Sequence, residues 1–286
     1  MTVAFALSGG GNLGPMQAGS MLGLMEAGIE PDLYVGTSVG ALNAAFLATR
    51  PGVEGARTLV EAWTALRRTH AFRVNVVAMM AGFIGFRDHL IRTERFRALI
   101  RRWVEVERIE DSPTPFGATA TDALSGEPVL LRAGDAVDAL AASSAIPGIF
   151  PPVRIQGQWL VDGSLSAGCP VLQAQAMGAD EVYLITTATA PRLAPPRGTV
   201  ALAMNSVSLI TARASREQLL AAQRQALRTG GRIYVVPSAE PAAPSPFDFS
   251  KSAALAEAAH ACTKEWLANA PQPLEGTPAP SGERPR

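Results

Sequence analysis

The sequence predicts an α/β fold in three layers, with a mainly parallel central sheet between two layers of helices. Short apolar runs that end at glycines alternate along the chain with longer segments of helical character, and this alternation is typical of parallel strands joined by helices. The chain has 286 residues, of which 48% are hydrophobic, so one domain with a large core is expected. We expect residues 1–269 to form that domain and residues 270–286, rich in proline and glycine, to form a disordered tail.

Two strand–helix units are expected at the start of the chain. Residues 2–8 form a short apolar run that glycines terminate, and residues 14–27 follow as a helix that closes near Gly28. Residues 32–38 form a second apolar strand, and the alanine-rich segment VGALNAAFLA continues from it as a helix.

The rest of the chain continues the alternation and adds two hairpins, each indicated by small turn residues between two apolar runs. The expected elements are, in chain order, helices at 53–69 and about 92–106, a hairpin of strands 115–123 and 127–133, a helix at 135–144, a hairpin over 153–163 around Gln156–Gly157, a strand at 180–187, a helix at 200–228, a strand at 232–237 and a helix at 252–268. The apolar stretch 74–86 is expected to cap the core as a buried helix, with a lid or an acyl-chain wall as the alternative.

The charge balance and the cysteines argue against several functional classes. The 25 basic residues equal the 25 acidic ones, so the basic surface of a nucleic-acid-binding protein is not expected. Cys169 and Cys262 form no CxxC motif, which argues against a metal or redox site of that kind. The first residues lack a basic region, and no uncharged apolar run reaches the roughly 20 residues that span a bilayer. We therefore expect a cytoplasmic protein, with peripheral membrane contact as an open alternative.

The glycine-rich loop 9–14 (GGGNLG) joins the first strand to the first helix. Small residues at a helix N-terminus allow backbone N–H groups to converge, and the helix dipole favours negative charge there. The loop is therefore a candidate oxyanion hole, in which Gly9, Gly10 and Gly11 would donate to a developing negative charge. A tight turn that binds nothing is the simpler alternative.

The same loop satisfies GxGxxG through Gly9, Gly11 and Gly14, the pattern of dinucleotide-binding folds. Asp32 lies at about the distance downstream that a ribose contact requires. In such folds the acidic residue closes the second strand, whereas Asp32 opens it. A nucleotide-dependent oxidoreductase is therefore the weaker hypothesis.

Ser38 is the candidate nucleophile. It lies at the centre of the GxSxG motif 36–40, between an apolar strand and a helix. In this context a sharp strand-to-helix turn exposes the serine hydroxyl at the edge of the sheet, and Gly36 and Gly40 remove side chains that would clash. The alternative is a glycine-rich turn without a catalytic role.

No histidine is well placed to serve as the base. In α/β-hydrolases the triad residues follow in the order serine, acid, histidine. His70 and His89 precede Asp162, the candidate acid, so neither fits that order. His260 comes late enough, but it lies off the apolar stripe of its helix. A serine–histidine–aspartate esterase that uses His260 is therefore disfavoured.

Asp162 is the candidate base. It ends an apolar strand and precedes Gly163, so its carboxylate would project into the rim that holds the serine and accept the hydroxyl proton directly. A turn-forming Asp-Gly pair is the structural alternative. Asp122 is a rival acid, but its position at a hairpin turn favours a structural role.

Four sequence blocks occur in one order along the chain. They are GGGNLG after the first strand, GTSVG after the second, SSAIPGIFPPV at 143–153 and VDGS at 161–164. In this combination, and in the hairpin before the third block, the chain resembles the patatin-like phospholipase family over roughly residues 3–190.

This resemblance implies a patatin-like domain and the roles of its site residues. Ser38 would be the nucleophile and Asp162 the base of a dyad that hydrolyses lipid acyl esters through an acyl-enzyme. Gly9, Gly10 and Gly11 would supply the oxyanion amides. The resemblance implies no metal and no cofactor. The implied partner is a lipid acyl ester, with peripheral contact to a membrane as an option and no particular oligomeric state.

Two positions depart from the family pattern. Leu13 stands where the family often has arginine or lysine, so a preference for phospholipid does not follow, and a catalytically weak lipid- or partner-binding relative is the alternative. Ser164 stands where glycine or alanine is common, which is a small change. The arginines of 92–106 alternate with Glu94 and Glu105, as on a solvated helix face, and contact with anionic lipid heads is the second interpretation of them.

Overall fold

An eight-stranded sheet runs through the centre of the molecule, in the strand order β5-β6-β3-β2-β1-β7-β8 with β4 paired to β3. The computed structural model describes residues 1–66, 93–187, 198–239 and 250–274. The strands are β1 (Val3–Leu7), β2 (Leu33–Thr37), β3 (Phe116–Asp122), β4 (Pro128–Leu131), β5 (Val153–Ile155), β6 (Gln158–Asp162), β7 (Glu181–Ile185) and β8 (Arg232–Val236). The strands from β3 to β8 in this order pair in parallel, whereas β4, β5 and β6 pair antiparallel. The predicted mainly parallel sheet is confirmed.

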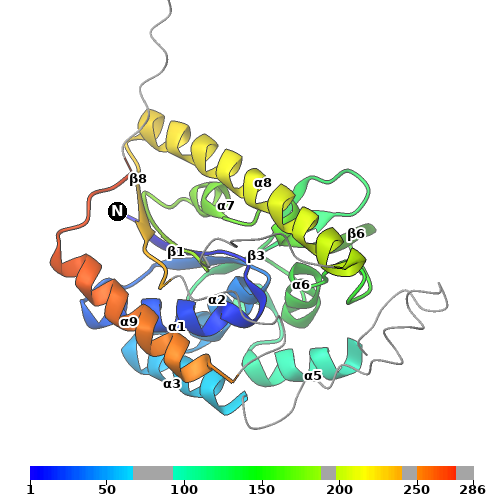
Figure 1. Ribbon diagram of the computed structural model, residues 1–286, viewed down its shortest axis with the longest axis horizontal. Coiled ribbons are helices and arrows are strands. Elements are labelled where there is room, and N and C mark those ends of the chain that lie inside the picture. Colours follow the sequence, from blue (N-terminus) through cyan, green and yellow to red (C-terminus); the bar gives the residue numbers. More distant parts are fainter. Residues whose placement is uncertain (67–92, 188–197, 240–249, 275–286) are drawn as a thin grey trace, which may run out of the picture.

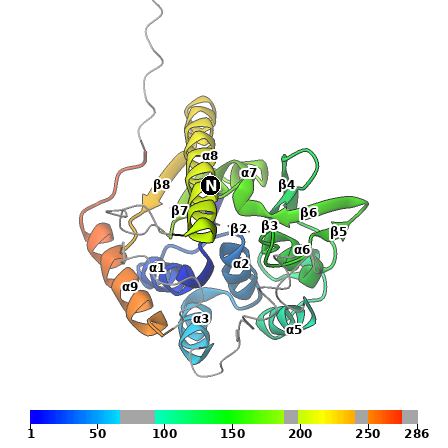
Figure 2. The same ribbon diagram turned by 45° about the vertical axis from the view of Figure 1, so that its right-hand side comes forward.

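Helices cover both faces of this sheet. They are α1 (Gly14–Glu26), α2 (Val39–Thr49), α3 (Gly52–Leu66), α5 (Thr93–Trp103), α6 (Ala136–Ser143), α7 (Val171–Ala176), α8 (Thr199–Thr229) and α9 (Ser252–Ala268). Figures 1 and 2 show α1, α2, α3 and α9 on one side of the sheet and α7 and α8 on the other. The three layers expected from the sequence are therefore present.

The side chains of β1 show how the two cores are divided. Phe5 and Leu7 belong to the larger cluster, which α1 and α2 cover, and both are fully buried. Ala4 and Ala6 point to the opposite face and belong to a second cluster with Ala222 of α8. Successive side chains of a strand alternate between the faces of its sheet. Because helices cover both faces, the residues of β1 are apolar without interruption.

The element boundaries agree closely with the sequence pattern. Gly28 closes α1 with a left-handed φ of 81°, as glycines commonly do after a helix. The short helix α7, which starts after Pro170, was not predicted. The predicted stretch 74–86 lies outside the described residues. Within the described part of the chain, no helix combines the length and the apolar character needed to span a bilayer.

Candidate active site

Strand register brings the candidate nucleophile and the candidate base together across β3. Thr37, the last residue of β2, pairs with Thr119. The next residue of β3, Ala120, pairs with Asp162. Ser38 follows Thr37 directly, so the two functional side chains meet over a single strand. The Ser38 hydroxyl donates a hydrogen bond of 2.7 Å to Oδ2 of Asp162.

The backbone of Ser38 adopts a conformation that is rare for a residue with a side chain. Its φ is 54° and its ψ is −121°, and such a conformation typically costs about 1–3 kcal/mol. The turn is held from both sides of the residue. The Ser38 carbonyl accepts hydrogen bonds from the amides of Ala41 and Leu42, and the Ser38 amide donates to the hydroxyl of Ser143 at 2.9 Å.

Ser143 is a site residue that the sequence did not reveal as such. It is the last residue of α6 and is fully buried. It belongs to the SSAIPGIFPPV block, but no local pattern tells which side chain of that block faces the nucleophile. The neighbouring Ser144 is also buried, yet its hydroxyl has no hydrogen-bond partner in the described structure.

Gly36 and Gly40 allow the nucleophile turn to pack against backbone. A Cβ on Gly36 would lie 2.2 Å from the carbonyl oxygen of Gly40. A Cβ on Gly40 would lie 2.4 Å from the carbonyl oxygen of Leu7, at the end of β1. Backbone atoms cannot move aside cheaply in a packed interior, so both positions require glycine, as the GxSxG motif predicts.

Asp162 is a buried carboxylate with few partners. Its side chain accepts from the Ser164 amide at 2.8 Å as well as from Ser38, and its main-chain carbonyl accepts from Thr121 at 2.9 Å. Burial raises the pKa of Asp162 above the ordinary 3.8, and the hydrogen bonds from Ser164 and Ser38 oppose that rise only in part. A carboxylate with a raised pKa is a stronger base than a solvated one.

The glycine-rich loop lies beside the nucleophile. A Cβ on Gly9 would lie 3.7 Å from the Cβ of Ser38. The Gly9 amide already donates to the carbonyl of Gly168 at 3.1 Å. For the amides of Gly10 and Gly11, no acceptor is found among the described residues. Of the three expected oxyanion donors, these two are therefore unengaged, and Gly9 anchors the loop.

A buried polar chain fixes the loop relative to α2. Gln17 donates to the carbonyl of Ser8 at 2.7 Å. Asn43 of α2 donates to the side chain of Gln17 and to the carbonyl of Gly14, both at 3.0 Å. The indole of Trp63 in turn donates to Asn43 at 2.8 Å. Buried polar groups with satisfied partners hold their neighbours rigidly, so the loop keeps its position next to Ser38.

The histidine that the structure describes is remote from Ser38. His260 contacts Glu26 at 2.8 Å, at the C-terminal end of α1. The N-terminal end of that helix adjoins the glycine-rich loop, and 13 helical residues span about 20 Å. His70 and His89 lie outside the described residues. The prediction that His260 is not the base agrees with this placement.

The two other acids considered from the sequence have structural partners. Asp122 accepts from the amides of Leu124 and Ser125, each at 2.9 Å, and these bonds lower the pKa of Asp122. Asp32 accepts from the amide of Val3 at 2.8 Å, at the start of β1, whereas the glycine-rich loop follows the end of that strand. Asp32 therefore cannot serve a nucleotide bound at the loop.

Leu13 points into the protein interior. It is buried in a small apolar cluster with Met16 and with Leu255 of α9. The residue that departs from the family pattern thus contributes to the packing of α9.

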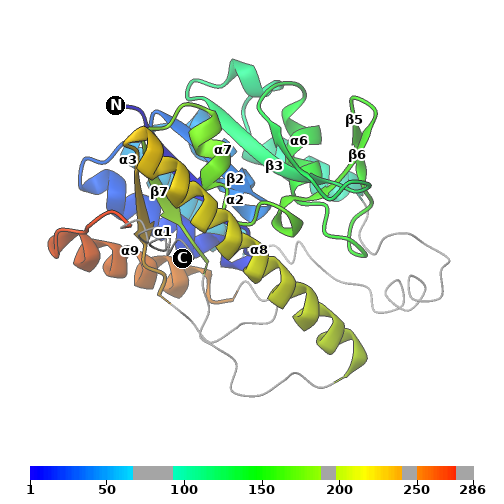
Figure 3. The same cartoon turned by 90° about the horizontal axis from the view of Figure 1, so that it is seen from above.

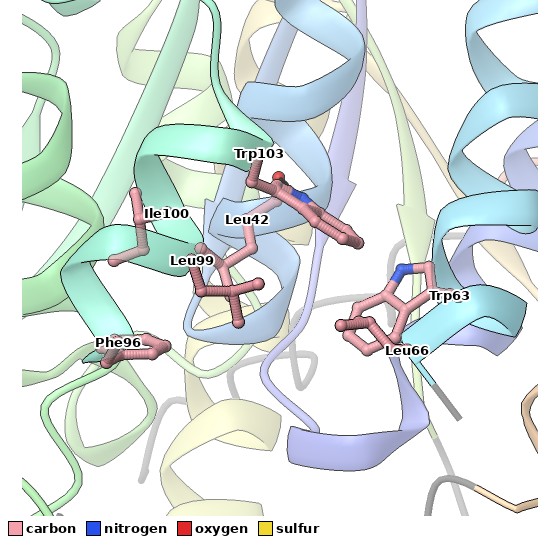
Figure 4. Close-up of a pocket in the computed structure, with 7 residues that line it drawn as sticks. All are labelled: Leu42, Trp63, Leu66, Phe96, Leu99, Ile100 and Trp103. Atoms are coloured by element: carbon pink, nitrogen blue, oxygen red, sulfur yellow. Dashed lines mark hydrogen bonds between the residues drawn. The ribbon is translucent and has the colours of Figure 1, made fainter. Parts of the chain in front are cut away.

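An apolar pocket lies between α2, α3 and α5. Figure 4 shows seven side chains from these helices around a common space: Leu42, Trp63, Leu66, Phe96, Leu99, Ile100 and Trp103. Leu42 lies in the first turn of α2, where its amide donates to the carbonyl of Ser38 at 3.2 Å. Helix α3 runs back along α2, so Trp63 lies beside this first turn, where its indole donates to Asn43. The pocket therefore adjoins the helix that carries the nucleophile.

A family model, several relatives and a solved structure match this chain. A sequence model of the patatin-like phospholipase family matches residues 5–174. An uncharacterized NTE family protein of Mycobacterium bovis is 31% identical over 182 residues, which cover 62% of this chain and 47% of that protein. Patatin-like phospholipase domain-containing protein 7 of Mus musculus is 27% identical over 189 residues, or 64% of this chain and 13% of that protein. The chain thus spans less than half the length of either relative. VipD from Legionella pneumophila superposes with a TM-score of 0.47 at 12% identity, over 96% of this chain and 68% of VipD.

The burial of Asp162 predicts a stability effect with a definite pH dependence. The pKa of Asp162 is higher in the folded protein than in the unfolded chain, where it is about 3.8. The free energy of unfolding therefore decreases as the pH rises from 3.8 through the pKa of the folded state. Each unit of the rise corresponds to about 1.4 kcal/mol. We expect Asp162→Asn to increase the free energy of unfolding in urea at pH 7, with the gain shrinking toward pH 4.

Asp122→Asn provides the opposite control. The pKa of Asp122 is lowered, so its contribution to stability is present above pH 3.8 and is lost as the pH falls. This variant should therefore be less stable than the wild type at pH 7. A loss of stability in Asp162→Asn at pH 7, or a gain that does not change with pH, would contradict the assignment of a raised pKa.

Proposed function

The chain belongs to the patatin-like phospholipase family, and from this membership and the site geometry we propose that it is a serine lipid acyl-hydrolase with a Ser38–Asp162 dyad. The observation that carries the proposal is the 2.7 Å hydrogen bond from the Ser38 hydroxyl to the buried carboxylate of Asp162. Burial raises the pKa of that carboxyl, which suits it to accept the hydroxyl proton without a histidine between them.

Acylation follows from this arrangement. Oδ2 of Asp162 takes the proton as Oγ of Ser38 attacks the carbonyl carbon of an acyl ester. The tetrahedral intermediate then collapses, the bond to the alcohol breaks, and the leaving oxygen takes the proton from Asp162. An acyl-enzyme and a free alcohol result. In the second half of the reaction Asp162 accepts a proton from water, which attacks the acyl-enzyme, and returns it to Oγ of Ser38.

The amides of Gly10 and Gly11 are the proposed oxyanion donors. They lie at the start of the path into α1, where the helix dipole adds positive potential, and they are unengaged in the described structure. The Gly9 amide is engaged with Gly168, so we assign Gly9 the role of keeping the loop close to Ser38. Donors held in place before the reaction stabilise charge without reorganisation.

We propose that the acyl chain of the substrate packs against the apolar side chains between α2, α3 and α5. The lining of this pocket is entirely apolar, and Leu42 connects it to the first turn after Ser38. An apolar chain gains about 0.8 kcal/mol for each methylene that it buries. A chain that enters this pocket would orient its ester toward Ser38.

The first test compares four proteins on a short-chain nitrophenyl ester. Ser38→Ala should abolish hydrolysis, and Asp162→Asn should lower kcat by about 10²–10⁴-fold because the general base is removed. His260→Ala should retain wild-type activity, because His260 is paired with Glu26 away from the site. In the wild type, kcat/KM should fall at acidic pH with an apparent pKa above 3.8, since only the ionised Asp162 accepts a proton.

Two outcomes would reject parts of this mechanism, and a labelling experiment identifies the serine directly. Loss of activity in a folded His260→Ala protein would reject the histidine-free dyad. Hydrolysis that survives in Ser38→Ala would reject the nucleophile. Labelling of the wild type, but not of Ser38→Ala, by a fluorophosphonate would identify the reactive serine independently of the ester chosen.

Ser143 should influence kcat through the position of Ser38. Ser143→Ala removes the acceptor of the Ser38 amide, and a buried donor without an acceptor favours relaxation of the turn. We expect kcat to fall about tenfold, equivalent to about 1.4 kcal/mol in the barrier, with KM nearly unchanged. Ser144→Ala is the matched control, because its buried hydroxyl has no partner. Equal losses in the two variants, or an effect on KM alone, would reject a positioning role for Ser143.

Chain-length preference tests the pocket. Leu99→Trp should fill the pocket that Leu99 lines, and so exclude long acyl chains while leaving the dyad intact. We expect kcat/KM for a long-chain nitrophenyl ester to fall at least about tenfold relative to the acetyl ester. An unchanged ratio between the two esters would place the acyl chain elsewhere.

A further inference from the structure

Helix α8 is much longer than its connection requires. It joins β7 to β8, which are adjacent and parallel. Each of these strands has 5 residues and is about 17 Å long, whereas the 31 residues of α8 span about 46 Å. A helix that only crosses the sheet could be less than half as long. A substantial part of α8 therefore extends past one end of the sheet.

Contacts identify the extended part as the N-terminal half. Ala222 and Ala226 of α8 are buried against the sheet. Further toward the N-terminus, the side chain of Gln218 donates to the carbonyl of Ser166. Ser166 belongs to the loop after Asp162, at the edge where the dyad lies. One turn earlier, Ser215 also packs against this loop, because a Cβ on Gly168 would lie 2.3 Å from the Ser215 hydroxyl. Residues of α8 before Ser215 thus project beyond the catalytic edge, and Figure 3 shows the yellow-green end of the helix extending clear of the sheet.

The projecting half is apolar at its tip and cationic nearer the body. Four large apolar side chains are exposed there by 45–67%: Leu202, Val207, Leu209 and Ile210. Residues 199–212 contain no charged side chain, and Arg213 and Arg216 follow. At 100° per residue, Leu202, Leu209, Arg213 and Arg216 share one face of the helix. Arg213 pairs with Glu217 at 3.0 Å on the surface, and such an exposed pair is weak.

We propose that this half of α8 docks the protein on a lipid bilayer, with Leu209 and Ile210 among the inserted side chains and Arg213 and Arg216 at the level of the lipid heads. Exposed apolar residues followed by arginines along one helix are the arrangement that binds at a membrane interface. The inference rests on the proposed function in one respect: the docked end is the one that holds Ser38, so a lipid ester leaving the bilayer would meet the dyad.

The test is binding to vesicles of phosphatidylcholine containing phosphatidylglycerol, measured by flotation. All proteins carry Ser38→Ala, so that hydrolysis does not alter the vesicles. The double variant Leu209→Gln/Ile210→Gln should bind at least tenfold more weakly than the parent. The matched control is Leu220→Gln/Leu227→Gln, which changes two exposed leucines nearer the other end of the same helix and should bind like the parent.

Activity measurements keep this inference separate from the proposed function. In proteins that retain Ser38, Leu209→Gln/Ile210→Gln should hydrolyse a soluble nitrophenyl ester at the wild-type rate but vesicle phospholipid more slowly. Equal vesicle binding by both double variants, or no binding by the parent, would overturn the docking proposal. A third outcome would also overturn it: the parent is a dimer, and Leu209→Gln/Ile210→Gln makes it a monomer without changing vesicle binding. The exposed face of α8 would then join two copies of the chain. Failure of every protein to hydrolyse the soluble ester would reject the proposed function and leave the binding result standing.

Discussion

The backbone conformation of Ser38 is the constraint on which the site depends. A φ of 54° in a residue with a Cβ must be held by its surroundings. Gly40 lets the first turn of α2 rest on the carbonyl of Leu7, while Ser143 holds the Ser38 amide from the other side. The turn is thus fixed by β1 and α6 together, and the Ser38 hydroxyl that it presents donates to Asp162.

The burial that suits Asp162 to the proposed role of base also lowers the stability of the fold. A buried carboxylate without a cationic partner is unfavourable when ionised, and a mutation that neutralises Asp162 should therefore stabilise the fold while removing the activity. Asp122 shows the contrast within the same chain. It is a carboxylate that two backbone amides satisfy, and its ionised form supports the hairpin. Two aspartates on neighbouring strands differ in role because their surroundings shift the pKa in opposite directions.

Local patterns predicted most elements and indicated the candidate nucleophile, because a strand that ends at glycines and the GxSxG motif are features of consecutive residues. The strand-end position of Asp162 suggested it as the base, but a turn-forming Asp-Gly pair was the alternative, and the family resemblance was needed to favour the pairing with Ser38. The two residues are 124 positions apart, and consecutive residues do not specify the order of strands in a sheet. The contact of Ser143 with the Ser38 amide, the bond between Gly9 and Gly168 and the inward direction of Leu13 were not predicted. Each depends on packing between segments that are distant in sequence, and the sequence pattern carries no register for such contacts.

The direction of β6 explains how an aspartate from so late in the chain reaches a serine near its start. Ser38 follows β2, so it lies at the edge where the parallel strands end. A strand parallel to β3 would reach this edge only at its C-terminal end, whereas β6 runs antiparallel to β3. It therefore runs inward from beyond the catalytic edge and ends at Asp162, opposite Ala120. Its chain then continues through Ser166, which α8 contacts. The strand that carries the proposed base thus also connects the Ser38–Asp162 pair to the helix that projects past the same edge.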